Sequence, residues 1–91
     1  MASLRERMRH ERFAYLTDLA FALDGRGVSC TLRLSGQVRE PAVLEMPGGV
    51  SGVVRVRMRK EGAGWQYTVG VYTVWAQGQD PVGTILRAVS R

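Results

Sequence analysis

The sequence predicts a single α+β domain in which four antiparallel strands form a meander between an N-terminal and a C-terminal helix. Three observations predict this fold class. Apolar residues recur at helical spacing near both ends of the chain, they alternate with polar residues in between, and short glycine-containing segments separate the alternating stretches. The resulting order is α-β-β-β-β-α. Because consecutive antiparallel strands need only short turns, the simplest arrangement is a meander with both helices packed on one face.

Length and composition fit one globular domain, residues 1–91, with 45% hydrophobic and 23% charged residues. A chain of this size buries only about 60–65% of its unfolded surface, so association with another chain would stabilise it. No apolar run is long enough to span a membrane, and no signal-peptide pattern is present. The single cysteine, Cys30, cannot form an internal disulfide and fits a reducing compartment. We therefore predict a cytoplasmic protein that does not bind membranes.

The first predicted helix lies between Ser3 and Gly25 and is about twenty residues long. Ser3 and Glu6 form a capping box, in which the serine hydroxyl accepts a hydrogen bond from the backbone N–H three residues on. Gly25 is expected to end the helix because glycine enters the left-handed region without a Cβ penalty. Residues 1–12 form the charged start of the helix and are expected to project. Residues 13–23 are apolar on nearly every side.

This second half of the helix carries more apolar side chains than one sheet can cover. A helix on a single sheet needs one apolar stripe. Four apolar residues lie off that stripe: Phe13, Ala14, Ala20 and Phe21. An exposed patch with two aromatic residues usually marks an interface, although the C-terminal helix or a loop could cover it instead. We expect a protein interface here, most simply that of a two-fold homodimer.

Alternation with period two predicts the first strand over residues 28–35, with Cys30 as a small hydrophobe in its apolar register. A turn at residues 36–37 leads to a second extended segment, residues 38–46, in which Pro41 favours a position at a sheet edge or an early interruption of the strand. Residues 47–52 contain glycines and a proline and form the next connection.

Three apolar residues alternate with three arginines over residues 54–59, which makes this the clearest strand of the chain. A glycine-containing loop then leads to one long fourth strand, residues 65–76. Its expected inward register is Tyr67, Val69, Val71, Thr73 and Trp75. Asp80 is the expected N-cap of a final amphipathic helix, with Pro81 at its first position and Val89 near its end.

The third strand also predicts a basic surface, because its arginines project from one face about 7 Å apart. The candidate residues are Arg33, Arg55, Arg57, Arg59, Lys60 and Tyr72. Tyr72 is included because it shares the outward register of the fourth strand and could stack on an arginine or a base. Three interpretations stay open: a device for solubility, a nucleic-acid site or a site for an acidic protein. The net charge of +5 is compatible with each.

Catalytic and metal-binding patterns are not recognised. No spacing arranges Cys30 and the single histidine, His10, as a catalytic pair, and the acidic residues form no ligand motif. The glycines of residues 48–52 lack the Lys-Ser/Thr ending of a phosphate loop and precede a strand. We predict no enzyme, no cofactor and no metal, but a protein-interaction or assembly module that associates with itself or with a partner through the first helix. The alternatives are nucleic-acid binding and a structural subunit of a larger complex. A ligand pocket near Trp65, Tyr67 and Trp75 is a further alternative.

A combination of residues is spread between positions 13 and 89. It consists of Tyr15, Leu16 and Leu19 in the first helix, Gly27-Val28 before the first strand, residues 41–44, Gly64-Trp65 after the hairpin loop, and Asp80 before the last helix. This combination resembles a loose group of small, mostly uncharacterised actinobacterial α+β proteins. Such proteins often accompany regulatory genes, so the resemblance implies a regulatory or accessory role. It assigns no functional residues, and the basic N-terminal arm lies outside it.

Overall fold

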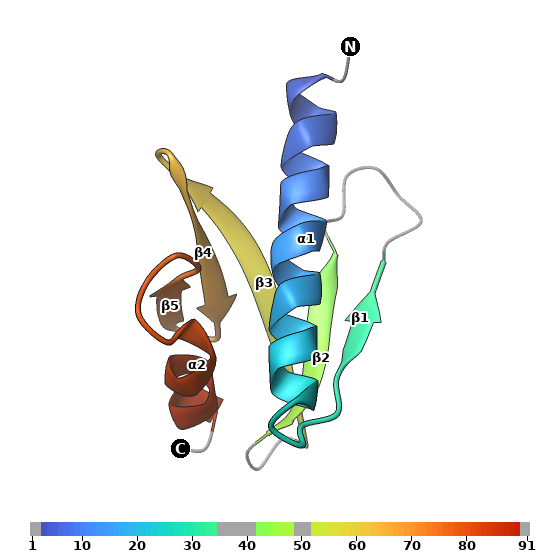
Figure 1. The fold of residues 1–91 in the computed structure, drawn as a ribbon, viewed down its shortest axis with the longest axis vertical. Helices are drawn as coiled ribbons and strands as arrows, with labels where there is room; N and C mark the ends of the chain where they lie inside the picture. Colours follow the sequence, from blue (N-terminus) through green and yellow to red (C-terminus); the bar gives the residue numbers. More distant parts are fainter. Residues whose placement is uncertain (1–2, 35–41, 49–51, 90–91) are drawn as a thin grey trace.

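Seven elements of secondary structure follow one another in the computed structural model, which describes residues 3–34, 42–48 and 52–89. They are α1 (Leu4–Asp24), β1 (Thr31–Arg33), β2 (Val43–Gly48), β3 (Gly52–Glu61), β4 (Gly64–Val69), β5 (Tyr72–Trp75) and α2 (Pro81–Val89). The strands lie in chain order, and each pairs antiparallel with the next (Figure 1). The predicted α+β fold and its meander are confirmed. The predicted number of strands was wrong, because the described sheet has five and not four.

The fifth strand arises because the expected fourth strand reverses direction at Gly70 and Val71. Gly70 has a φ of 60°, which a glycine adopts without strain, and Val69 pairs directly with Tyr72 across the turn. Since directly paired residues face the same side of a sheet, the inward register changes from odd to even numbers at this point. Val74 is therefore buried, and Val71 is 93% exposed at the tip of the turn.

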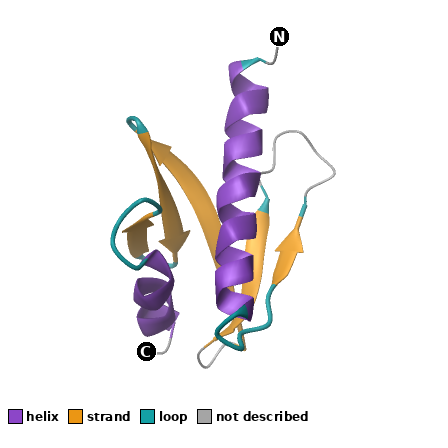
Figure 2. Cartoon of the chain, viewed as in Figure 1, coloured by secondary structure: helices purple, strands orange, loops and turns teal. Residues whose placement is uncertain are grey.

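Both helices cover the same face of the sheet (Figure 2), which confirms the prediction. α1 packs against β1, β2 and β3, and α2 packs against β4 and β5. The buried strand residues all share this face: Leu44, Met46, Val56, Met58, Trp65, Tyr67, Val69 and Val74. The helices contribute Leu16, Leu19, Leu23 and Ile85 to the same core. On the opposite face, none of the described strand residues is buried.

The helix ends show why the chain folds locally as it does. Ser3 Oγ accepts a hydrogen bond from the Glu6 N–H at 3.2 Å, as the capping box predicts. The helix ends before Gly25 as predicted, but the expected left-handed conformation of Gly25 was wrong. Its φ is −63°, and Gly27, with a φ of 79°, takes that conformation three residues after the helix. The difference arises because the chain makes a further turn before the Val28 N–H bonds to the Leu23 carbonyl at 2.9 Å.

Asp80 caps α2 as predicted, since its Oδ1 accepts a hydrogen bond from the Gly83 N–H at 3.0 Å. A Cβ at Gly83 would lie 2.1 Å from Asp80 Oδ2, so only glycine leaves room for this cap. The predicted turn at residues 36–37 and Pro41 lie outside the described residues, as do residues 49–51 of the glycine-rich connection. An edge position for the second strand was wrong, because β2 lies between β1 and β3. Neither described helix is sufficiently long and apolar to cross a membrane.

Candidate interaction surfaces

The first candidate surface is the side of α1 that the sheet does not cover. Phe13, Thr17 and Phe21 follow one another at intervals of four residues and therefore form a line along the helix. Phe21 is 74% exposed and Phe13 is 43% exposed. Ala14 is also exposed, whereas Ala20 is partly buried against the core. We call Phe13, Ala14, Thr17, Ala20 and Phe21 the α1 flank.

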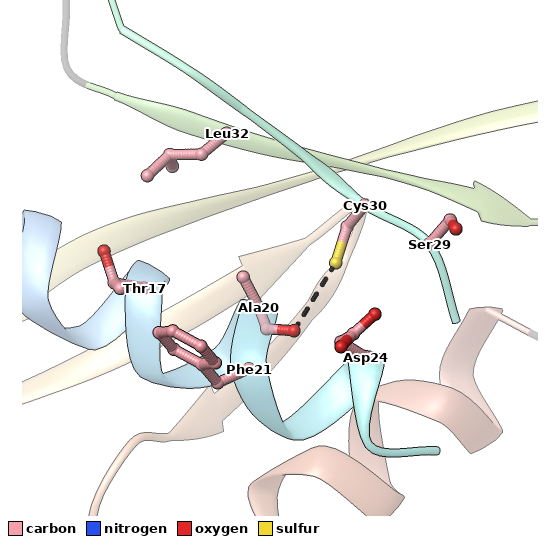
Figure 3. A pocket seen from close by; sticks show the side chains of 7 residues that line it. All are labelled: Thr17, Ala20, Phe21, Asp24, Ser29, Cys30 and Leu32. Carbon is pink, nitrogen blue, oxygen red and sulfur yellow. Dashed lines mark hydrogen bonds between the residues drawn. The ribbon is translucent and has the colours of Figure 1, made fainter. Parts of the chain in front are cut away.

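A groove separates the α1 flank from β1, the terminal strand of the described sheet (Figure 3). Its volume is about 280 Å³, and it is open to solvent. The lining residues are Thr17, Ala20, Phe21, Asp24, Ser29, Cys30 and Leu32. Leu34, just after β1, is a further apolar side chain near this edge and is 65% exposed. The groove thus joins an apolar helix flank to a strand that has no outer neighbour among the described residues.

Cys30 forms part of the groove wall, and its thiol faces α1 (Figure 3). Sγ lies 3.8 Å from the carbonyl oxygens of Ala20 and Val28. Burial raises the pKa of the Cys30 thiol, and the nearby Asp24 carboxylate raises it further. A nucleophilic cysteine needs the opposite shift. His10 is ten residues, or about 15 Å along α1, from the Ala20 that Cys30 contacts. Within the described ranges, no three metal-binding side chains gather.

The second candidate surface, the open face, is the side of the sheet that the helices leave uncovered. The register places these residues on it: Arg33, Glu45, Arg55, Arg57, Arg59, Gln66, Thr68, Thr73 and Trp75. Glu45 pairs with both Arg33 and Arg55, the latter at 3.3 Å. Arg59 pairs with Glu61 at 2.7 Å. Among the described residues, Arg57 is the one arginine of this face without an acidic partner.

Two residues predicted for the basic surface lie on the helix-covered face instead. Lys60 pairs with Trp65 in the register, and its Nζ lies 3.7 Å from a Glu11 carboxylate oxygen of α1. It follows Arg59 directly, and adjacent residues of a strand point to opposite faces. Tyr72 lies on the same face because the turn at Gly70 and Val71 reverses the expected register. Both placements correct the sequence prediction.

Trp75 and Thr73 were both predicted to face inward, and both lie on the open face; of the two, Trp75 has the larger side chain to offer a ligand. Trp75 pairs with Gln66, so it lies in the same cross-strand row as Arg59, and it is 48% exposed. Its ring rests on β4 at Gly64, where a Cβ would approach Trp75 Cζ3 to 2.8 Å. Gly70 was the signal that could have placed Trp75 outside. A two-residue turn at Gly70 and Val71 changes the register of the residues that follow it.

The predicted ligand pocket between α1 and the sheet is filled by direct contacts. Trp65 donates a hydrogen bond from Nε1 to Glu11 at 2.7 Å, and the Arg12 guanidinium lies 5.4 Å from the centroid of the same ring. The Tyr67 hydroxyl donates to the Tyr15 carbonyl at 2.9 Å, and burial raises the Tyr67 pKa to about 12. Trp65 and Tyr67 therefore hold α1 in place, and Trp75 lies on the other face.

Comparison with protein-family models, with curated proteins and with solved structures gives no match. The resemblance to small actinobacterial proteins stays a prediction for this reason. The α1 flank and the open face are the two surfaces that bear on function. These two surfaces differ in chemistry: the first is apolar and adjoins a groove, and the second combines arginines with an exposed tryptophan.

Proposed function

We propose that this chain is a non-enzymatic protein-interaction module, regulatory or accessory in role and cytoplasmic, that associates with a second copy of itself through the α1 flank. The observation that carries the proposal is the exposure of Phe21, 74%, beside the partly exposed Phe13. Moving a phenylalanine side chain fully out of water contributes about 1.5–3 kcal/mol. The flank therefore supplies a driving force for association that folding of the single chain leaves unused.

The groove beside the α1 flank offers a place for the Phe21 side chain of the second copy. Its volume of about 280 Å³ exceeds the roughly 150 Å³ that accommodates a benzene ring in a protein interior. A two-fold axis beside the flank would place Phe21 of each copy against the groove of the other, so that one contact is made twice. Cys30 and Leu32 would then gain apolar neighbours.

Net charge does not oppose two copies of α1 as neighbours. The helix contains four arginines, two glutamates and two aspartates, so its formal charge is zero with His10 neutral. Two such helices do not repel each other as whole bodies, although the chain has a net charge of +5. The excess positive charge lies in other parts of the chain.

Sedimentation of the wild type, Phe21→Glu and Val71→Glu tests self-association. Val71 is the matched control, because it is an exposed apolar residue at the β4–β5 turn and receives the same charge. We expect the wild type and Val71→Glu to dimerise alike. Phe21→Glu should raise the dissociation constant at least about 30-fold, which corresponds to about 2 kcal/mol.

A wild type that stays monomeric at the highest soluble concentration contradicts self-association. So does a Phe21→Glu protein that dimerises as the wild type does. If the wild type is monomeric and the intact complex from the host has the mass of this chain plus a different protein, the alternative of a subunit in a larger assembly takes its place.

A further inference from the structure

Two neighbouring rows of side chains cross β3, β4 and β5 on the open face. One row is Arg59, Gln66 and Trp75, and the other is Arg57, Thr68 and Thr73. Neighbouring strands are about 4.8 Å apart and rows on one face about 7 Å, so an arginine and the tryptophan are separated by about 10 Å across the sheet. Hydrogen-bonding side chains occupy the middle of each row.

Trp75 presents an aromatic surface at one side of these rows. Its ring is supported from β4 at Gly64, and it is 48% exposed. An aromatic ring that lies on a sheet and is open to solvent can stack on a nucleic-acid base. Bases in a duplex already stack on each other, so only an unpaired base can reach such a ring.

The other side of the rows is positively charged. β3 places three arginines and one glutamate on the open face, a formal charge of +2 within a chain of +5, since Lys60 lies on the helix-covered face. Arg57 has no acidic partner among the described residues. The Arg59–Glu61 pair is exposed on both sides, 61% and 49%, and such exposed pairs are weak. The Arg55 pair differs, because its Glu45 side chain is only 14% exposed. A phosphate can therefore replace the Glu61 carboxylate at Arg59 with little loss.

We propose that the open face binds single-stranded nucleic acid, with a base stacked on Trp75 and the phosphates next to Arg57 and Arg59. Gln66 lies between Arg59 and Trp75 in the same row, and its side-chain amide can donate a hydrogen bond to the edge of the base and accept one from it. An acidic protein would satisfy the arginines but would not need the flat, exposed ring of Trp75. This proposal is independent of self-association, because it uses the face of the sheet opposite α1.

Fluorescence anisotropy with labelled oligothymidylate and oligouridylate of about twelve nucleotides tests the proposal at low salt, about 50 mM. Arg57→Gln should weaken binding and reduce the slope of log affinity against log salt by about 0.7, the value for one phosphate contact on a single strand. Trp75→Ala should weaken binding about 5- to 150-fold without changing this slope. Trp75→Phe keeps an aromatic ring and should restore much of the affinity.

Arg9→Gln is the matched control, because it removes the same charge from an exposed arginine of α1. It should change the affinity less than about twofold. Circular dichroism of each variant shows whether the fold is kept. If Trp75→Ala does not fold, the proposal is judged from the oligonucleotide affinities of Trp75→Phe and Arg57→Gln, each compared with that of Arg9→Gln.

Absence of binding to both oligonucleotides at low salt overturns the proposal. Equal losses for Arg57→Gln and Arg9→Gln also overturn it, because they show attraction by net charge only. Binding to heparin or an acidic peptide as strong as to the oligonucleotides, and unchanged in both Trp75 variants, identifies the open face as a general polyanion surface. None of these outcomes affects the sedimentation test of the α1 flank.

Discussion

The α1 flank and the open face are both exposed, but they are composed in opposite ways. The helix that carries the flank has no net charge, and its exposed centre is two phenylalanines. The strand at the centre of the open face, β3, places three arginines and one glutamate there, a formal charge of +2. Contacts of the first kind act at short range and depend little on salt, whereas those of the second act over a Debye length of about 10 Å and weaken as salt rises. The comparison indicates two surfaces with separate physical signatures.

The largest expected effect tests whether the flank is truly outside the core. Leu19 is 2% exposed and Phe21 is 74% exposed, although they are two residues apart on α1. Leu19→Ala should lower the free energy of unfolding by about 2–5 kcal/mol, because it leaves a cavity. Phe21→Ala should change it by less than about 0.5 kcal/mol. Chemical denaturation at low protein concentration, where the monomer prevails, measures both. A loss of stability in Phe21→Ala comparable to that in Leu19→Ala would show that the flank belongs to the core.

A smaller effect concerns alkaline pH, since Tyr67 helps to hold α1 over the sheet. The pKa of Tyr67 is raised from about 10 to about 12 in the folded chain. Its contribution is therefore fully present below pH 10 and is lost as the pH rises through 12, on the order of 2 kcal/mol. Tyr67→Phe lacks this titration and the hydrogen bond to the Tyr15 carbonyl.

Urea denaturation of both proteins between pH 8 and pH 12 isolates the Tyr67 contribution, because all other alkaline titrations are common to them. The wild type should lose more stability than Tyr67→Phe above pH 10. Parallel curves for the two proteins would show that the Tyr67 hydroxyl is not protected in the folded state.

The smallest expected effect concerns Glu45, which faces Arg33 and Arg55 on the open face. Glu45→Gln frees both arginines and removes a negative charge, so oligonucleotide affinity should rise about threefold to tenfold at low salt. Glu61→Gln frees Arg59 and serves as the parallel variant. An affinity that falls in either variant would indicate that the glutamates position the arginines for binding. Anisotropy under the same conditions measures the change.

The sequence predicts the parts of this fold that depend on local chemistry. The Ser3 cap, the alternation around Val56 and the Asp80 cap are each determined by neighbouring residues, and the structure confirms them. The apolar surplus at Phe13 and Phe21 was equally visible, because one sheet covers only one stripe of a helix.

The remaining features depend on pairings between distant residues. Apolar or β-branched residues occupy both registers after Gly70, so alternation alone does not reveal where the chain turns. The position of the turn at Gly70 and Val71 decides whether Trp75 or Tyr72 lies on the open face. The pairing of Glu45 with both Arg33 and Arg55 depends on the registers of two strand pairs. Neither register follows from spacing along the chain.

The two tryptophans of the chain lie in opposite environments and so provide one optical reporter for each region. Trp65 is 2% exposed beneath α1, whereas Trp75 is 48% exposed on the other side of the sheet. A soluble quencher such as acrylamide should reach the second ring and spare the first. In versions of the chain with a single tryptophan, quenching of Trp65 would report detachment of α1 from the sheet. Protection of Trp75 from the quencher would report a ligand on the open face. Neither measurement needs an added dye.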